Sequence, residues 1–261
     1  MTAPRSQRSA LAWLRELAPL FLAGAALLAF WKLITVAANY PAFLLPAPES
    51  VAGRFLAALG DGTFARHLPA TVAEVLLGFA AGGTLALLLG YLLARSHLAE
   101  RLLSPYLVAA QATPILALAP LIALWFGSGL LSKVIICALI CFFPIAVATM
   151  VGVRSVDGGL VEMAQSFGAR RRQLLTTLEV PAALPQIFGG LRVGVTLAVV
   201  GAIVAEWAGG ERGLGVLINL ARGSLFDTPL LFATLAAIAL LGVGLYVVVV
   251  LVERQVIGGR S

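Results

Sequence analysis

The chain has 261 residues, of which 61% are hydrophobic and only 11% charged, with a formal net charge of +6 and a mean hydropathy of +1.01. A soluble domain carries about a quarter charged residues, so this composition excludes an ordinary soluble protein. The apolar residues come in runs of the roughly 20 residues needed to cross a bilayer core, without the alternation of a membrane β-barrel. We predict an all-α, polytopic membrane protein that does not bind nucleic acid, because in this class positive charge marks cytoplasmic loops.

Six apolar runs predict six transmembrane helices. They cover approximately residues 17–38, 68–94, 102–125, 130–153, 186–208 and 229–252. Arg5, Arg8 and Arg15 precede the first run as in a signal peptide, but no clear cleavage site follows, so we expect a retained first span. Three prolines between Pro41 and Pro48 then break the chain, and "PESVAGRFLAALGDG" predicts a short amphipathic helix at the membrane surface.

The basic residues predict the orientation of the chain. If the N-terminus is cytoplasmic, eleven of the 18 lysines and arginines lie in inner segments, five in outer segments and two within runs. This bias favours both termini inside. We expect a cytoplasmic segment over 1–16, a membrane domain over 17–253 and a cytoplasmic tail over 254–261. A polar loop over 158–185 then faces the cytoplasm.

Polar groups within two of the runs are candidates for a substrate path. In the third run, Gln111 and Thr113 are polar, and Pro114 leaves one helix carbonyl without its usual partner. These groups either face a substrate or are satisfied locally, and the sequence leaves both possibilities open. At the outer end of the fifth run, Glu206 and Trp207 could line an outer gate, although the tryptophan is also typical of an interfacial aromatic belt.

No motif predicts an enzyme, and we expect no catalytic residue and no metal site. The stretch "GSGLLSK", ending at Lys133, lacks the second glycine and the final Ser/Thr of a phosphate-binding loop, so ATP would have to bind to another chain. Cys137 and Cys141 lie four residues apart in an apolar run. They lack further ligands for a metal, and we interpret them as small packing residues.

An ion-coupled carrier is a weaker alternative. Such proteins usually hold ionisable groups deep in the membrane. Lys32, Glu74, Arg192 and Glu206 lie within runs but close to their predicted ends, where long side chains can reach water. None of them has an evident partner in the sequence.

The segment "EMAQSFGARRRQLLTTLEVPAALP" begins at Glu162 and carries the most specific signal. "GLVEMAQSF" predicts a short helix, and Gly168 suits its C-terminal end, where φ is usually positive. Leu160, Met163 and Phe167 recur at helical spacing and form one apolar stripe.

A second helix is expected over about 169–179. It would start with three arginines, which anionic lipid head groups would attract. Pro181 and Pro185 are expected to stop this helix and redirect the chain into the fifth run.

This segment resembles the cytoplasmic EAA loop of ABC importer permeases, whose pattern is E-A-A, three residues, G, nine residues, I-x-L-P. The positions that match outright are Glu162, Ala164, Gly168 and Pro181. Other apolar residues stand at Met163, Leu178 and Val180. Stretches such as "LLPAPESV" and "GVRSVD" are similar to the permeases for nitrate, sulfonates, taurine and thiamine or riboflavin precursors. "ATPILALAPLIALWFG" and "VGAIVAEWAGG" are most similar to the vitamin-precursor permeases.

The resemblance implies a permease subunit without a bound cofactor in the inner membrane of a bacterium. It implies a homodimer with two ATPase chains, which would bind ATP and Mg²⁺, and an extracytoplasmic substrate-binding protein. The residues implied to contact and couple to the ATPase are Glu162, Met163, Ala164, Phe167, Gly168 and Pro181. The expected substrate is riboflavin or a thiamine pyrimidine precursor, with sulfonate, taurine or nitrate as alternatives.

Overall fold

The computed structural model describes residues 10–37, 41 and 43–258, so residues 1–9 of the predicted N-terminal segment and 259–261 of the predicted tail lie outside the described residues. All regular elements within these ranges are helical. They are α1 (Ala10–Ala37), α2 (Pro48–Gly60), α3 (Thr63–Arg95), α4 (His97–Ala112), α5 (Ile115–Phe126), α6 (Leu130–Arg154), α7 (Gly158–Ser166), α8 (Arg171–Gln173), the π-helical turn η1 (Leu174–Glu179), α9 (Val180–Gly209), α10 (Leu214–Arg222) and α11 (Thr228–Gly258).

Four helices are long and apolar enough to cross a membrane: α3, α6, the continuous helix Arg171–Gly209 and α11. A fifth span results if α4 and α5 are taken as one broken helix. The first predicted run is helical in α1, whose apolar part is Phe21–Ala37. At 1.5 Å per residue this part is about 25 Å long, slightly shorter than a bilayer core. The count of six spans, and their orientation in a membrane, stay predictions.

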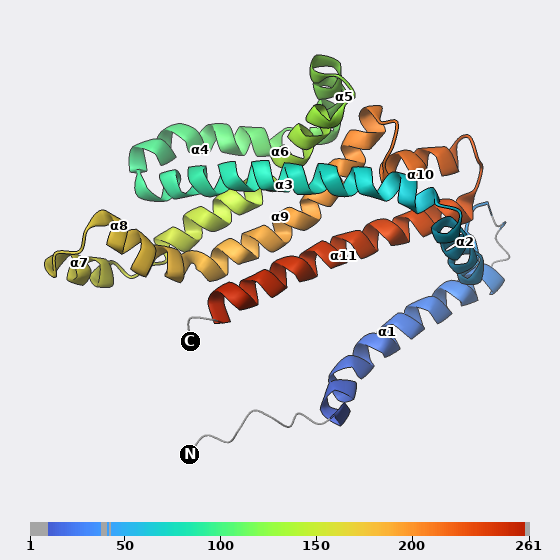
Figure 1. Ribbon diagram of the computed structural model, residues 1–261, viewed down its shortest axis with the longest axis horizontal. Helices are drawn as coiled ribbons and strands as arrows, with labels where there is room; N and C mark the ends of the chain where they lie inside the picture. Colours follow the sequence, from blue (N-terminus) through green and yellow to red (C-terminus); the bar gives the residue numbers. More distant parts are fainter. Residues whose placement is uncertain (1–9, 38–40, 42, 259–261) are drawn as a thin grey trace.

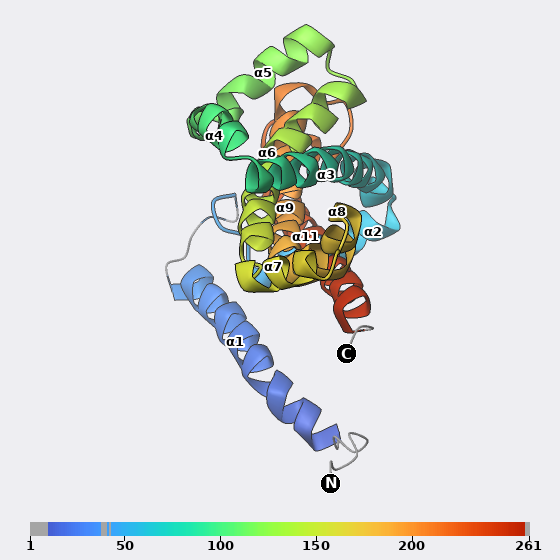
Figure 2. The ribbon, with the colours of Figure 1, turned by 90° about the vertical axis from the view of Figure 1, so that its left-hand side faces the viewer.

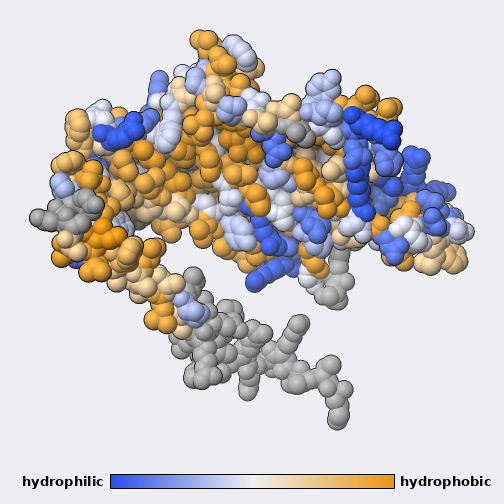
Figure 3. Space-filling view, turned by 180° about the vertical axis from the view of Figure 1, so that it is seen from behind, coloured by the Kyte–Doolittle hydropathy of each residue, from blue (hydrophilic) through white to orange (hydrophobic). Residues whose placement is uncertain are grey.

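The long helices lie side by side along the molecule (Figure 1). α2 and α10 lie at one end of this bundle, and α7, α8 and the last turns of α11 lie at the other. Seen from the α7 end, α5 projects away from the bundle and α1 stands apart on the opposite side (Figure 2). Apolar residues dominate the middle of the back face, and hydrophilic residues are dense at the end that carries α7 and α8 (Figure 3).

The core forms where α6 packs between α3 and α9, and glycines set the spacing of these helices. A Cβ placed on Gly82 of α3 would lie 2.5 Å from the carbonyl oxygen of Ala138 in α6, and one on Gly201 of α9 would lie 2.9 Å from the Cα of Cys137. Only glycine permits such an approach, and small residues are the usual means of close helix packing in membranes. Cys137 and Cys141 are free and fully buried in this core, which confirms their packing role.

The third run is two helices rather than one kinked span. α4 and α5 meet at an angle of 94° across a break of two residues. Thr113 is extended there (φ −73°, ψ 126°), and Pro114 precedes the first turn of α5. A residue before proline is disfavoured in the helical region, which explains why the helix ends at this point.

The expectation that Pro181 and Pro185 stop a helix is wrong. η1 continues directly into α9, so that Pro181 occupies the first turn of α9 and Pro185 lies within it. The N–H of Val180 bonds to Leu175 O, five residues back. With this wider turn directly before Pro181, the chain passes through the proline into the membrane helix without a break.

The amphipathic helix α2 is confirmed, and part of its apolar face is covered by protein. Val51 is buried, and the Phe55 ring lies 5.1 Å from that of Phe64 in α3. Leu56 and Leu59 remain exposed.

Candidate functional site

The predicted docking loop folds into a defined bracket of α7, α8 and η1. The Asp157 side chain caps α7 by accepting a hydrogen bond of 2.8 Å from the N–H of Gly159. At the other end, Gly168 N–H bonds to Gln165 O at 2.9 Å and Ala169 N–H bonds to Ala164 O at 3.0 Å. This pair of bonds is a Schellman motif, which needs a left-handed residue. Gly168 supplies it with φ +77°, and the predicted helix and its glycine stop are both confirmed.

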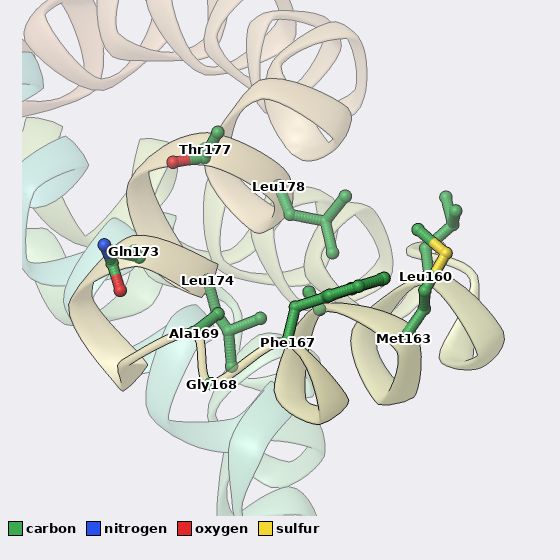
Figure 4. Close-up of a pocket in the computed structure, with 10 residues that line it drawn as sticks. Leu160, Met163, Phe167, Gly168, Ala169, Gln173, Leu174, Thr177 and Leu178 are labelled. Atoms are coloured by element: carbon green, nitrogen blue, oxygen red, sulfur yellow. The ribbon is translucent and has the colours of Figure 1, made fainter.

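The bracket encloses an apolar groove of about 420 Å³. Leu160, Met163 and Phe167 line it from α7, and Leu174 and Leu178 line it from η1. Figure 4 shows the Phe167 ring extending from the end of α7 toward Leu160 and Met163. The Phe167 side chain is 85% exposed although it is fully apolar. An exposed apolar patch at a polar end of the molecule is typical of a protein interaction site.

The other predicted coupling residues lie around this groove. Ala164 and Gly168 line it. Glu162 is exposed on α7 outside the lining of the groove, and its carboxylate makes no ion pair within the described ranges. Pro181 lies in the first turn of α9, where it continues the helix rather than shaping the groove. Their role in coupling stays a prediction.

Two ion pairs that the sequence did not indicate lie at the end of the bundle next to the bracket, and the pair of Arg95 and Glu179 joins the bracket to α3. Arg95, at the end of α3, binds the Glu179 carboxylate, which is 1% exposed. Arg154, at the end of α6, donates two hydrogen bonds of 2.7 Å to Glu100 and one of 2.9 Å to Leu93 O. The available signal for this ion pair in the sequence was Glu179, which is an isolated acid in the apolar stretch "LEVP".

Glu206 and Trp207 hold the turn between α9 and α10. The Glu206 carboxylate, 1% exposed, accepts hydrogen bonds from the N–H of Gly215 and, at 2.6 Å, from the hydroxyl of Thr71. The Trp207 indole donates to Gly215 O at 3.1 Å. A Cβ on Gly213, which has φ +136°, would lie 2.1 Å from the Glu206 carboxylate. Both predicted gate residues therefore hold this turn closed in the structure, and a substrate contact stays a prediction.

A buried ion pair lies beside this turn. Lys133 Nζ is 2.7 Å from the Glu74 carboxylate, and their side chains are 8% and 2% exposed. Lys133 also lies 3.4 Å from the carbonyl of Arg212 in the turn. No partner of Glu74 is evident in the sequence, because its approach to Lys133, 59 residues away, depends on the packing of α6 against α3. Lys32 and Arg192 are also paired, with Glu49 and Glu253.

The three polar candidates of the third run separate into two kinds. The Thr113 hydroxyl donates to Ala109 O at 3.0 Å, and its N–H donates to Ala110 O at 3.2 Å. The break at Pro114 is therefore satisfied locally. Gln111 instead has an exposed side chain that lines a cleft beside α6 and α9. The structure does not bring Gln111 together with Glu206. Within the described ranges no cluster of His, Cys, Asp or Glu side chains could hold a metal.

Comparison with known proteins agrees with this architecture. Residues 82–258 match the family described as the inner membrane component of binding-protein-dependent transport systems. The chain belongs to this family, and it is the permease subunit of an ABC importer.

Among similar proteins is the riboflavin transport system permease protein RibX of Chloroflexus aurantiacus, 51% identical over 88% of this chain and 86% of that protein. The formylaminopyrimidine transport permease protein ThiX of Halalkalibacterium halodurans is 39% identical over 83% of this chain and 86% of its own. The taurine permease TauC of Escherichia coli is 32% identical over 81% and 78%.

Two solved structures share the fold at low identity. The MetNI methionine ABC transporter aligns with a TM-score of 0.62 at 17% identity, over 75% of this chain and 94% of that one. An amino acid ABC transporter aligns with a TM-score of 0.60 at 19% identity, over 77% and 98%. Both are ABC transporters of the predicted fold class.

The buried ion pair makes a testable prediction. Lys133→Met leaves the buried carboxylates of Glu74 and Glu206 without a cation, and breaking such a pair costs about 3–5 kcal/mol. We expect a lower melting temperature in detergent, measured by size-exclusion chromatography after heating. In the double variant Lys133→Met with Glu74→Gln, the carboxylate that has lost its cation is neutral as well. Most of the decrease in melting temperature should then be recovered. If the single variant melts like the native chain, the pair does not stabilise this end of the bundle.

Proposed function

We propose that this permease imports riboflavin or a related vitamin precursor. The observation that carries the proposal is the 51% identity to a riboflavin permease along most of both chains, followed by the 39% identity to a formylaminopyrimidine permease. Both named solutes are small, nitrogen-containing heteroaromatic molecules. The sulfonate and taurine permeases are 32–36% identical, which makes their solutes the second candidates.

The proposed assembly places two copies of this chain in the inner membrane of a bacterium. Each copy would contact one subunit of an ATPase dimer, which binds ATP and Mg²⁺, while a substrate-binding protein delivers the solute from outside. The family name supports the binding protein and the membrane location. This chain would bind no cofactor and catalyse no reaction.

The α7 groove is the proposed contact with the ATPase. Phe167 and Met163 offer apolar surface that no other described part of the chain covers, and Gly168 sets the angle between α7 and α8. Arg95 and Glu179 would transmit movement of the bracket to α3 and α9, because this pair joins η1 to the end of α3. An ATPase that closes on ATP would thereby shift the helices between two states.

Transport in a defined system tests the substrate. We expect the purified permease, its ATPase and its binding protein in proteoliposomes to accumulate riboflavin only when ATP is enclosed with the ATPase. Uptake should survive an ionophore that collapses ion gradients. If taurine accumulates in place of riboflavin, the substrate belongs to the second candidates, the sulfonates and taurine. Uptake that needs the ion gradient but no ATP would contradict an ABC mechanism.

The same system tests coupling through the groove. Phe167→Ala removes the most exposed apolar side chain of the groove, and Gly168→Asp forces a residue with a Cβ into φ +77°. We expect both variants to fold and to lose about tenfold or more of the solute imported per ATP hydrolysed, because one hydrophobic contact or a strained turn is worth roughly 1–3 kcal/mol. Gln165→Ala, on the α7 surface outside the groove, is the control. If the native chain and the three variants import the same amount of solute per ATP hydrolysed, the groove is not the contact that couples the ATPase to transport.

A further inference from the structure

A cleft of about 510 Å³ opens between α4, α6 and α9. Its walls include Gln111 of α4, Phe143 and Val147 of α6, and Gln186, Gly189 and Gly190 of α9. A smaller hollow of about 140 Å³ shares Gln111, Phe143 and Val147 with it and adds Ser104. The combined space falls within the roughly 300–1,000 Å³ typical of small-molecule sites.

Close packing and glycine shape the α9 wall of the cleft. A Cβ on Gly190 would lie 2.5 Å from the Cβ of Ala148, so α9 touches α6 directly at this point. A Cβ on the adjacent Gly189 would meet nothing within 4 Å, which leaves open space above the backbone. The walls come from the C-terminal half of α6 and the N-terminal half of α9, which are the parts nearest α7. The cleft therefore lies in the half of the bundle that the coupling bracket would move.

The polar residues that line this cleft are neutral. Gln111 of α4 and Gln186 of α9 are both exposed and both line the cleft. No residue that lines either hollow in the described part of the chain carries a charge. The nearby cations point elsewhere, because Arg192 is bound to Glu253 and Arg154 to Glu100.

An aromatic ring completes the site. Phe143 lines both hollows. The ring of Phe142 packs against it edge-to-face, with centroids 5.2 Å apart and an interplanar angle of 86°. This contact orients the Phe143 ring, which lines the same cleft as Gln111 and Gln186, and an oriented aromatic face can stack on a flat heterocycle.

We propose that this cleft is the solute site on the inner half of the path, and that it selects neutral, flat heteroaromatic solutes over sulfonate-type anions. The inference rests on the proposed function and assigns the residues that recognise the substrate class. A glutamine amide both donates and accepts, as an imide or aminopyrimidine edge requires. A sulfonate would instead favour a cation, and no lining residue of the cleft in the described part of the chain is charged.

The buried positions of the native cysteines permit a direct test. Cys137 and Cys141 are 0% exposed, so a thiol introduced at Gln111→Cys or Gln186→Cys in the full transporter would be the accessible one. We expect a water-soluble maleimide to label both variants, and riboflavin to slow that labelling severalfold. Taurine should have no effect. Gln255→Cys, an exposed glutamine of α11 outside the cleft, should label at the same rate with or without either solute.

Transport by the alanine variants gives a second measurement. With saturating binding protein, Gln111→Ala and Gln186→Ala should each lower the initial rate of riboflavin uptake roughly two- to tenfold, the value of one hydrogen bond. Gln255→Ala, an exposed position of α11 outside the cleft, should transport at the native rate.

The outcomes separate the two proposals. If the native transporter imports no riboflavin, the proposed function fails. If it imports riboflavin while the cysteines stay unprotected and the alanine variants transport normally, the function stands and the cleft assignment is overturned. Protection by taurine rather than riboflavin would reject the proposed selectivity.

Discussion

The close approach of α6 to α3 and α9 is the constraint on which the rest of the structure depends. Helices in a membrane gain little from burying apolar surface, because lipid is apolar as well, so they associate through tight packing. Here the contact is made at the level of the backbone, with Gly82 against Ala138 and Gly201 against Cys137. A larger residue at either glycine would separate the helices. The buried pair of Glu74 and Lys133 is possible only because α3 and α6 are this close.

Functional groups occur at both ends of this three-helix core. At one end, Glu206 and Thr71 fix the turn that follows α9. At the other, Arg95 and Glu179 join the coupling bracket to α3 and to the start of α9. α9 runs without interruption from η1 to that turn, through Pro185, over 30 residues. On the proposed function, a displacement of the bracket would therefore move the wall of the cleft that carries Gln186 and reach the turn at Glu206 along a single helix.

Local signals allowed much of this fold to be predicted from the sequence. Gly168 was recognised because a helix stop with positive φ needs glycine, and the stripe of Leu160, Met163 and Phe167 needs only helical spacing. Features that depend on distant parts of the chain were missed. Lys133 and Glu74 are 59 residues apart, and no pattern in either segment indicates that they meet. Pro181 was misinterpreted for a different, local reason, since a helix can continue through a proline when the turn before it is wider, as η1 is.

The central claim is that the exposed apolar groove of α7 seats the ATPase. Photo-crosslinking in the assembled transporter tests it most directly, with benzoylphenylalanine incorporated in place of Phe167. Phe226, equally exposed at 84% but located just before α11 at the opposite end of the bundle, is the matched control. The account predicts a covalent product of one permease and one ATPase chain from position 167 and none from position 226. Crosslinks from position 167 to the binding protein, or to no protein, would contradict it.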